Sequence, residues 1–195
     1  MTKKSKTART LMLLGCLLLC AAAALTAYNV VSEARADTRA GKTVEMLKTV
    51  IPARTDTETT AKQMQTITVD GNTYIGYISI PALNIDLPVN SEWSYPLLKK
   101  APCRYKGSVY TDDLIIAGHN YQRHFGGLKL LQTGDEVDFT DADGIVCKYT
   151  VSSVEKLTGK DVQGMEDGDW DLTLFTCTIG GAYRVTVRCQ RADNS

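Results

Sequence analysis

The sequence predicts an all-β domain, an antiparallel barrel or sandwich with short helices and loops, behind an N-terminal transmembrane helix and a stalk. From residue 67 onward, short runs of β-branched and aromatic residues alternate with turn residues, which is typical of these folds. Residues 11–27 are uncharged and apolar, and residues 32–65 are too polar to fold alone. The length of 195 residues and the 44% hydrophobic content suit one compact domain with extensions. We therefore expect a basic tail (1–9), an anchor (10–31), a stalk (32–65) and a domain (66–195).

The N-terminal apolar run predicts a single membrane crossing. At about 1.5 Å per residue, residues 11–27 just reach across the hydrocarbon core of a bilayer as a helix. The positive charges before the run hold the N-terminus in the cytoplasm; they are Lys3, Lys4, Lys6 and Arg9. The domain is then expected at the outer face of the cell membrane. The alternative is a cleaved signal peptide, for which residues 34–36, Ala-Arg-Ala, provide a small-x-small cleavage site.

Turn residues divide the domain into short strands. Asp70-Gly71 and residues 141–144 are turn signals, and prolines stand at strand ends, where the ladder loses no hydrogen-bond donor. These signals place strands at 73–80, between Pro81 and Pro88, and at 114–117, 136–140 and 145–151. Within the stalk, a short amphipathic helical patch is expected around Val44, Leu47 and Val50.

The last two predicted strands, 172–178 and 183–191, have a register that can be counted. Gly180-Gly181 suits a two-residue hairpin turn, which places Cys177 opposite Arg184 with Cβ atoms roughly 5 Å apart. One face of this hairpin then carries Thr173, Phe175, Cys177, Arg184, Thr186 and Arg188. The other face is apolar enough to be the core side and carries Leu174, Thr176, Val185, Val187 and Cys189.

The residues of this hairpin suggest thiol chemistry. A cysteine is a strong nucleophile only as the thiolate, and a guanidinium opposite Cys177 favours that charge. Because arginine cannot act as a general base, a histidine is needed to protonate a leaving amine. His119 follows a buried apolar run and Gly118, which permits close approach, whereas His124 lies in a polar segment and is expected at the surface. Taken alone, His119 is better explained as a histidine that merely caps a strand end.

Charge and cysteine content exclude other classes of function. Lys plus Arg and Asp plus Glu both total 22, so net charge gives no reason to expect a nucleic-acid partner. Cys16 and Cys20 lie in the anchor, and Cys147 and Cys189 are expected to be buried hydrophobes. The acidic residues make calcium possible but show no calcium-loop spacing, and no zinc-like cluster is present, so no cofactor or metal is expected.

Gly118-His119, the segment 173–177 (Thr-Leu-Phe-Thr-Cys) and the cross-strand Arg184 together resemble the sortase family. The resemblance covers residues 77–189, includes Ile80-Pro81, and suggests a class B- or D-like member. It implies an eight-stranded β-barrel that cleaves an LPXTG-like sorting signal of secreted surface proteins after the threonine, leaving an acyl-thioester on Cys177. An amine acceptor, either a lipid-linked cell-wall peptidoglycan precursor or a pilin lysine, then resolves the thioester.

The resemblance also implies roles for individual residues. His119 would be the general acid and base, and Arg184 the charge stabiliser, with Arg188 on the same face as a second candidate. The candidate substrate-binding residues are Thr176, Asn120 and Trp170, and Met165 could join Trp170 in a pocket for the leucine and proline of the signal. The single crossing and stalk also resemble sortases, which act at the outer face of Gram-positive membranes. The competing hypotheses are a hydrolytic cysteine protease and a non-enzymatic anchored adhesion module with Cys177 buried or disulfide-linked.

Overall fold

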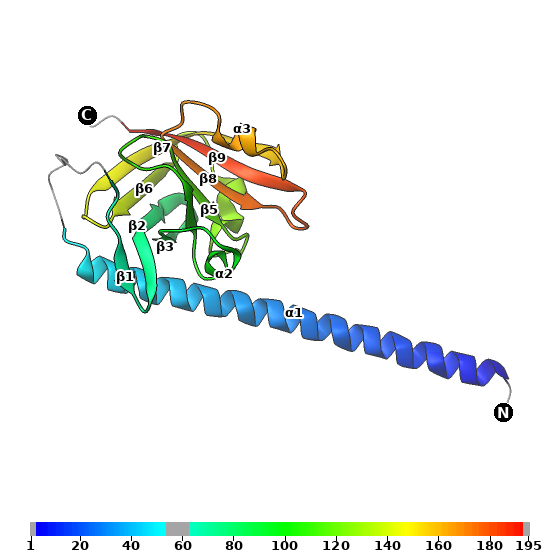
Figure 1. Cartoon of the computed structure of the whole chain (residues 1–195). Coiled ribbons are helices and arrows are strands. Elements are labelled where there is room, and N and C mark those ends of the chain that lie inside the picture. Colours follow the sequence, from blue (N-terminus) through cyan, green and yellow to red (C-terminus); the bar gives the residue numbers. More distant parts are fainter. Residues whose placement is uncertain (1–2, 54–62, 193–195) are drawn as a thin grey trace. The chain divides into compact units, whose positions relative to one another are not determined.

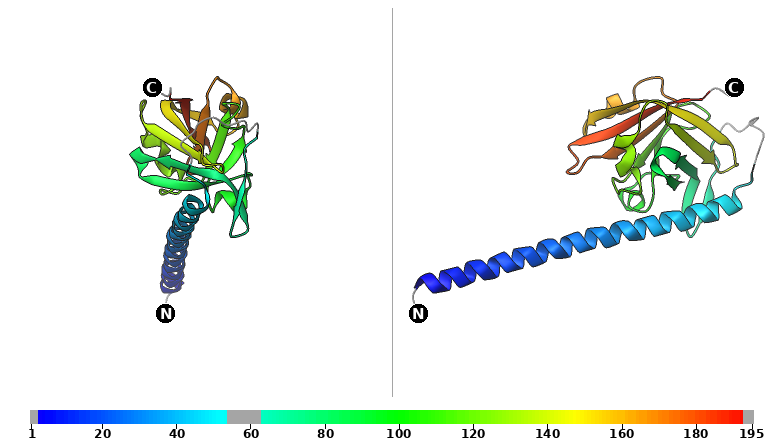
Figure 2. Two further views of the ribbon diagram at one scale, coloured as in Figure 1. Left: turned by 90° about the vertical axis from the view of Figure 1, so that its left-hand side faces the viewer. Right: turned by 180° about the vertical axis from the view of Figure 1, so that it is seen from behind.

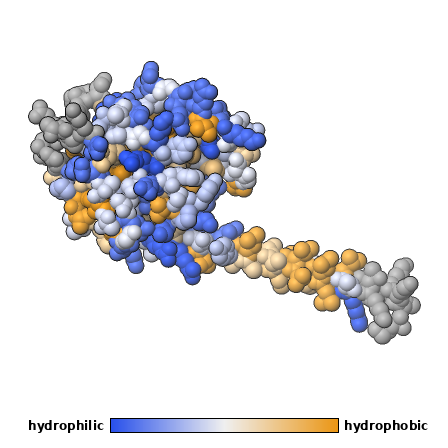
Figure 3. Space-filling model, in the orientation of Figure 1, coloured by the Kyte–Doolittle hydropathy of each residue, from blue (hydrophilic) through white to orange (hydrophobic). Residues whose placement is uncertain are grey.

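The computed structural model describes residues 3–53 and 63–192 and divides into two units, Met1–Arg35 and Ala36–Ser195. Helix α1 (Lys3–Val50) forms all of the described part of the first unit and enters the second. The side chains of residues 8–31 are exposed, and this part of the helix is long and apolar enough to cross a membrane. Figure 3 shows its apolar side chains in orange. One apolar N-terminal helix therefore fits the predicted anchor.

The second unit contains a closed β-barrel of eight strands, as the resemblance implied (Figures 1 and 2). The strands follow one another around the barrel in the order β2, β3, β4, β5, β8, β9, β7 and β6, and pairing of β6 with β2 closes it. Strand β1 pairs only with β2 among the described residues and extends it as a hairpin. The bounds are β1 Ile67–Val69, β2 Asn72–Ile80, β3 Ile85–Asn90, β4 Cys103–Lys106, β5 Leu114–Gly118, β6 Glu136–Asp141, β7 Val146–Thr158, β8 Leu172–Cys177 and β9 Tyr183–Arg191. Short helices connect them: η1 Pro81–Leu83, α2 Tyr95–Leu98, η2 Phe125–Leu130 and α3 Val162–Glu166.

The barrel is not wholly antiparallel, which differs from the sequence prediction. Strand β5 pairs in parallel with β8, and β3 pairs in parallel with β4. Alternation of apolar and polar residues identifies a strand but not its partner, so the prediction could not contain these pairs. The β5–β8 pair matters for the site, because parallel strands end at the same edge of a sheet.

Two apolar clusters cover the two faces of the β5–β8–β9 sheet. The barrel interior contains Leu114, Ile116, Leu172, Leu174, Val187 and Cys189, all fully or nearly fully buried. The outer face carries a smaller cluster of Ile115, Ala117, Phe175 and Met165, against which Leu98, Tyr105 and Leu157 pack. Helix α3 contributes Met165 and therefore covers part of the outer face.

The C-terminal part of α1 packs on the barrel. The buried residues of this segment share one face of the helix and its end; they are Ala36, Ala40, Val44, Leu47 and Ile51. Leu47 and Ile51 contact Tyr74, and Lys48 Nζ lies 2.7 Å from Asp86 Oδ2. Val50, the third member of the predicted amphipathic patch, is exposed. Part of the segment expected as stalk thus belongs to the folded unit, while residues 54–62 of the stalk lie outside the described residues.

Candidate active site

The parallel pairing of β5 and β8 brings His119 and Cys177 to neighbouring strand ends. Gly118, the last residue of β5, pairs with Thr176. His119 follows Gly118 and Cys177 follows Thr176, so both occupy the next position along strands about 4.8 Å apart. Two residues that are distant in the sequence therefore become lateral neighbours.

The β8–β9 hairpin places Arg184 on the other side of Cys177. Cys177 and Arg184 are paired residues of the antiparallel ladder, which confirms the predicted register. The backbone N–H of Thr178 donates to the carbonyl oxygen of Tyr183 at 2.8 Å, and Gly180 and Gly181 take φ angles of 83° and 72°. Such positive φ angles suit glycine, because it has no Cβ. His119, Cys177 and Arg184 thus lie in that order across three adjacent strands, with the thiol in the middle.

The environment of the outer face suits a reactive thiol. Cys177 is exposed and forms no disulfide. The guanidinium of Arg184 lies 5.5 Å from the centroid of the Phe175 ring, close enough for a cation–π interaction. This contact holds the guanidinium over the face that Cys177 shares.

Gly118 allows the chain after β5 to fold back tightly. A Cβ at this position would lie 2.3 Å from atoms of the Phe125 ring, so any side chain there would displace Phe125. The N–H of Phe125 donates to the carbonyl oxygen of His119 at 3.1 Å. The close approach expected at Gly118 is therefore made by an aromatic ring that closes the loop behind His119.

His124 is buried, and the prediction of a surface position is wrong. Its exposed fraction is 1%, and neither ring nitrogen has a hydrogen-bond partner among the residues that the structure describes. Burial, together with the nearby His119, lowers the pKa of His124 to about 4, so its imidazole is neutral at pH 7. The polar neighbours in the sequence gave no sign of this, because the loop turns the His124 side chain inward.

Buried His124 predicts acid-sensitive stability. Between its unfolded pKa of about 6.5 and its folded pKa of about 4, the unfolded chain binds the proton more tightly. Stability is therefore lost as pH falls through this window, by about 2 kcal/mol between pH 7.5 and pH 5. Denaturant unfolding at both pH values checks this against His124→Leu, which lacks the titrating group. Identical pH dependence in the two proteins would contradict the prediction.

Arg188, the second arginine candidate, is engaged elsewhere. Its exposed fraction is 3%, and its Nε lies 2.6 Å from Glu155 Oε1. Its Nη1 donates to the carbonyl oxygen of Met165 at 2.8 Å and to Thr173 Oγ1 at 3.1 Å, and Nη2 donates to the carbonyl oxygen of Gly164. Arg188 therefore fastens α3 to the sheet, which leaves Arg184 as the arginine beside the thiol.

The three candidate substrate-binding residues lie in different environments. Asn120 is half-buried and follows His119 directly. Thr176 is buried, and its position in the alternation of β8 turns its side chain toward the barrel interior, away from the face of Cys177. Trp170 lies before the start of β8 and packs over Gly168, seven residues from Cys177 and on the order of 20 Å away at the usual rise of a strand. Of these three, Asn120 adjoins His119, and Thr176 adjoins Cys177 with its side chain buried.

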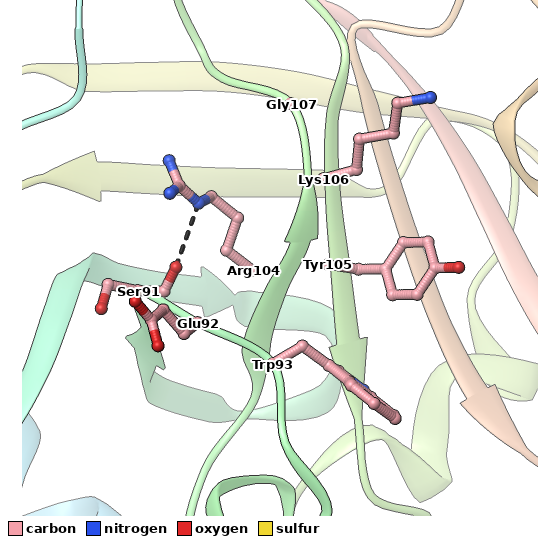
Figure 4. Close-up of a pocket in the computed structure, with 7 residues that line it drawn as sticks. All are labelled: Ser91, Glu92, Trp93, Arg104, Tyr105, Lys106 and Gly107. Carbon is pink, nitrogen blue, oxygen red and sulfur yellow. Dashed lines mark hydrogen bonds between the residues drawn. The ribbon is translucent and has the colours of Figure 1, made fainter.

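An open cavity of about 630 Å³ lies on the barrel surface beside these strands and was not anticipated from the sequence (Figure 4). It is lined by Ser91, Glu92, Trp93, Arg104, Tyr105, Lys106 and Gly107. The Tyr105 ring lies edge-on to Trp93 and also to Phe175, with centroids 6.4 and 5.5 Å away. Tyr105 is an extra residue in β4, where the pairing with β5 shifts register, and such a bulge re-aims a side chain. Aromatic contacts thus connect this cavity with the strand that ends at Cys177.

The other cysteines of the barrel differ from Cys177. Cys103, Cys147 and Cys189 are buried and form no disulfide. Burial raises the pKa of Cys103 to about 11, that of Cys189 to about 12, and that of Cys147 in the same direction. These thiols stay protonated and inert at neutral pH. Within residues 3–53 and 63–192 no group of three or more potential ligand residues could hold a metal ion, and the expected lack of a cofactor stays a prediction.

Comparison with known proteins finds a matching family model and a curated relative from the same family. A family model described as a sortase domain matches residues 78–192. Sortase A of Bacillus anthracis is 30% identical over 115 residues; the match covers 56% of this chain and 54% of that protein, so the chain spans about half the length of this curated relative.

Solved structures agree in fold. Sortase C1 of Streptococcus agalactiae is 26% identical with a TM-score of 0.57, covering 81% of this chain and 88% of that one. Sortase A of Corynebacterium diphtheriae is 25% identical with a TM-score of 0.57, covering 64% and 63%. A sortase D5 transpeptidase of Clostridium perfringens, 19% identical, shares the fold with a TM-score of 0.60 over 80% and 99%. These relatives have class A, C and D names, so the subclass stays a prediction.

Proposed function

The chain belongs to the sortase family, and on this premise we propose that it is a cysteine transpeptidase with Cys177 as its nucleophile. The observation that carries the proposal is the pairing of an exposed thiol with Arg184 across the last hairpin. A guanidinium at this position can attract the carbonyl oxygen of a bound peptide and stabilise the negative charge that develops on it. Of the four cysteines in the barrel, Cys177 is the exposed one.

The reaction we propose has two steps. The Sγ atom of Cys177 attacks a peptide carbonyl carbon, and the negative charge that develops on the carbonyl oxygen is stabilised by Arg184. As the C–N bond breaks, protonated His119 gives its proton to the leaving amine, and an acyl-thioester remains on Cys177. His119 then takes a proton from an incoming amine, whose nitrogen attacks the thioester carbonyl and releases the thiolate of Cys177.

The proposed first substrate is an LPXTG-like sorting signal, cleaved after its threonine. The outer face supports this choice, because it offers an apolar cluster around Phe175 at the strand that ends in Cys177. Trp93 and Tyr105 extend the aromatic surface from this cluster into the cavity beside it (Figure 4). An extended peptide with leucine and proline side chains can bury apolar surface there while its threonine carbonyl reaches the thiol.

The proposed second substrate is a primary amine at the outer face of the cell membrane. It is the amino group of a peptidoglycan precursor or a lysine of a pilin subunit. The apolar helix α1 supports attachment to the membrane, and the positive charges at its start favour a cytoplasmic N-terminus and an extracellular barrel. In that orientation the barrel meets exported proteins and cell-wall precursors.

The test uses the full chain in detergent micelles with a panel of LPXTG-like peptides, each with and without a small primary amine. Mass spectrometry follows the acyl adduct, the hydrolysed peptide and the ligated peptide. Amine-dependent ligation supports a transpeptidase, whereas hydrolysis that the amine does not change would favour the hydrolytic cysteine protease. If no peptide forms an adduct and Cys177 of the folded protein resists alkylation, the proposal of an enzyme is wrong.

The hypothesis of a non-enzymatic adhesion module is less favoured. It requires Cys177 to be buried or disulfide-linked, and the thiol is exposed and free. The same alkylation measurement separates the two, because an inert structural cysteine would resist the reagent.

A further inference from the structure

The loop after β5 is closed by backbone hydrogen bonds that fix its shape. The carbonyl oxygen of Tyr121 accepts from the N–H of His124 at 3.0 Å and from the N–H of Gly126 at 2.9 Å. A Cβ at Gly126 would lie 2.7 Å from the carbonyl oxygens of Asn120 and Tyr121, so this turn requires glycine. With the Phe125 N–H donating to His119, the loop folds onto itself just beyond the strand end. Its side chains are therefore held in a constant arrangement.

Within this loop, the ring of Tyr121 contacts both histidines. Its centroid is 3.9 Å from that of His119 with an interplanar angle of 28°, which is a stacked pair. Its centroid is also 5.5 Å from that of His124 with an interplanar angle of 63°, which is an edge-on pair. Since His124 has an exposed fraction of 1%, its closely packed ring gives the Tyr121 ring a fixed contact.

Stacking of this kind restrains an imidazole in a way that a surface loop does not. A half-exposed histidine at a strand end has several staggered side-chain rotamers, of which few direct the ring toward a neighbouring strand. An aromatic ring stacked at a centroid distance of 3.9 Å favours the rotamer that keeps the two rings together, and it also attracts an imidazolium through the π electrons. If the imidazole is already oriented, the side chain loses no further conformational entropy when it reacts.

We propose that Tyr121 is a positioning residue for His119 and that contact with the buried His124 holds Tyr121 in place. The inference rests on the acid and base role proposed for His119. Tyr121 acts through the face of its ring and not through its phenolic hydroxyl, because the stacked geometry involves only the ring. Phenylalanine at position 121 should therefore preserve the effect, and an aliphatic residue of similar volume should remove it.

The experiment uses NMR on the full chain with isotope-labelled histidine in detergent micelles. The chain has only two histidines, so each imidazole gives its own signals, and His124→Gln assigns them. In the unaltered protein and in Tyr121→Phe, the His119 ring protons should be shifted upfield by the stacked ring, and the imidazole should show restricted motion. In Tyr121→Leu, the upfield shift should disappear and the imidazole should become mobile. Lys129→Gln, at an exposed position of η2 further along the chain, is the control and should behave as the unaltered protein.

Kinetics provide the second readout. Tyr121→Leu should lower kcat by about 10- to 100-fold with KM nearly unchanged, because the peptide still binds while the imidazole is misplaced. Tyr121→Phe should restore most of the rate. The inference is overturned if Tyr121→Leu keeps a shifted and restrained His119, or if the restraint is lost and kcat stays the same. If the unaltered enzyme ligates no peptide, the proposed function fails, while the mobility of His119 still decides whether Tyr121 restrains it.

Discussion

Alanine at position 177 is expected to abolish the covalent adduct with every sorting-signal peptide while the barrel stays folded. No other group on the outer face can form the thioester, so turnover should fall by at least about 1,000-fold. Cys177 is exposed at the end of β8, and loss of its Sγ leaves no buried cavity. Mass spectrometry of the protein after incubation with peptide measures the adduct, and thermal unfolding measures the fold.

Alkylation of the native protein provides the control for this variant. Iodoacetamide should modify Cys177 but spare Cys103 and Cys189, which are buried and whose pKa values are raised. Peptide mapping separates these sites from Cys16 and Cys20 in the apolar helix. After unfolding in denaturant, all of these thiols should react. An acyl adduct that persists in Cys177→Ala would show that another residue is the nucleophile.

The part of the site that the sequence predicted is the part determined by neighbours in the chain. The pairing of Cys177 with Arg184 follows from a glycine turn and a strand period of two, both of which are local properties. The division of the hairpin into an apolar interior face and a polar outer face has the same origin. Gly118 was also recognised locally as a point of close approach, although the ring that approaches it was not.

The remainder depends on contacts between distant segments. Nothing in residues 114–118 indicates that β5 pairs in parallel with β8, so the position of His119 beside Cys177 was inferred from the resemblance alone. The burial of His124 depends on a loop that turns back on its strand, and polar neighbours concealed it. The sequence did not predict strand β4, because its pairing with β5 is bulged and its side chains do not alternate simply. The surface cavity that Tyr105 lines was missed for the same reason.

The two arginines of β9 carry the same charge on the same face, but their environments differ. Arg184 is half-buried beside Cys177, with its guanidinium over the Phe175 ring. Arg188 is buried and bonded to Glu155, Thr173 and the carbonyl oxygens of α3. The sequence favoured Arg184 by register and kept Arg188 as a second candidate on the same face, but nothing in it indicated that Arg188 is buried and bonded to α3.

Replacing each arginine with alanine is expected to give opposite results. Arg184→Ala should lower kcat by about 100- to 1,000-fold, because one donor to the oxyanion is lost, while the unfolding free energy changes by less than about 1 kcal/mol. Arg188→Ala should lower the unfolding free energy by about 2–4 kcal/mol, because it leaves buried acceptors around α3 without their donor.

Arg184→Lys separates charge from shape in this comparison. Lysine keeps the positive charge but lacks the planar fork of the guanidinium, so an intermediate rate is expected. Denaturant unfolding and single-turnover acylation of the three variants measure stability and chemistry independently. If Arg184→Ala and Arg188→Ala lose the same activity at the same stability, the register does not identify the stabilising residue. The rate of acylation per folded molecule therefore decides between the two arginines, because it corrects for activity that is lost only through unfolding.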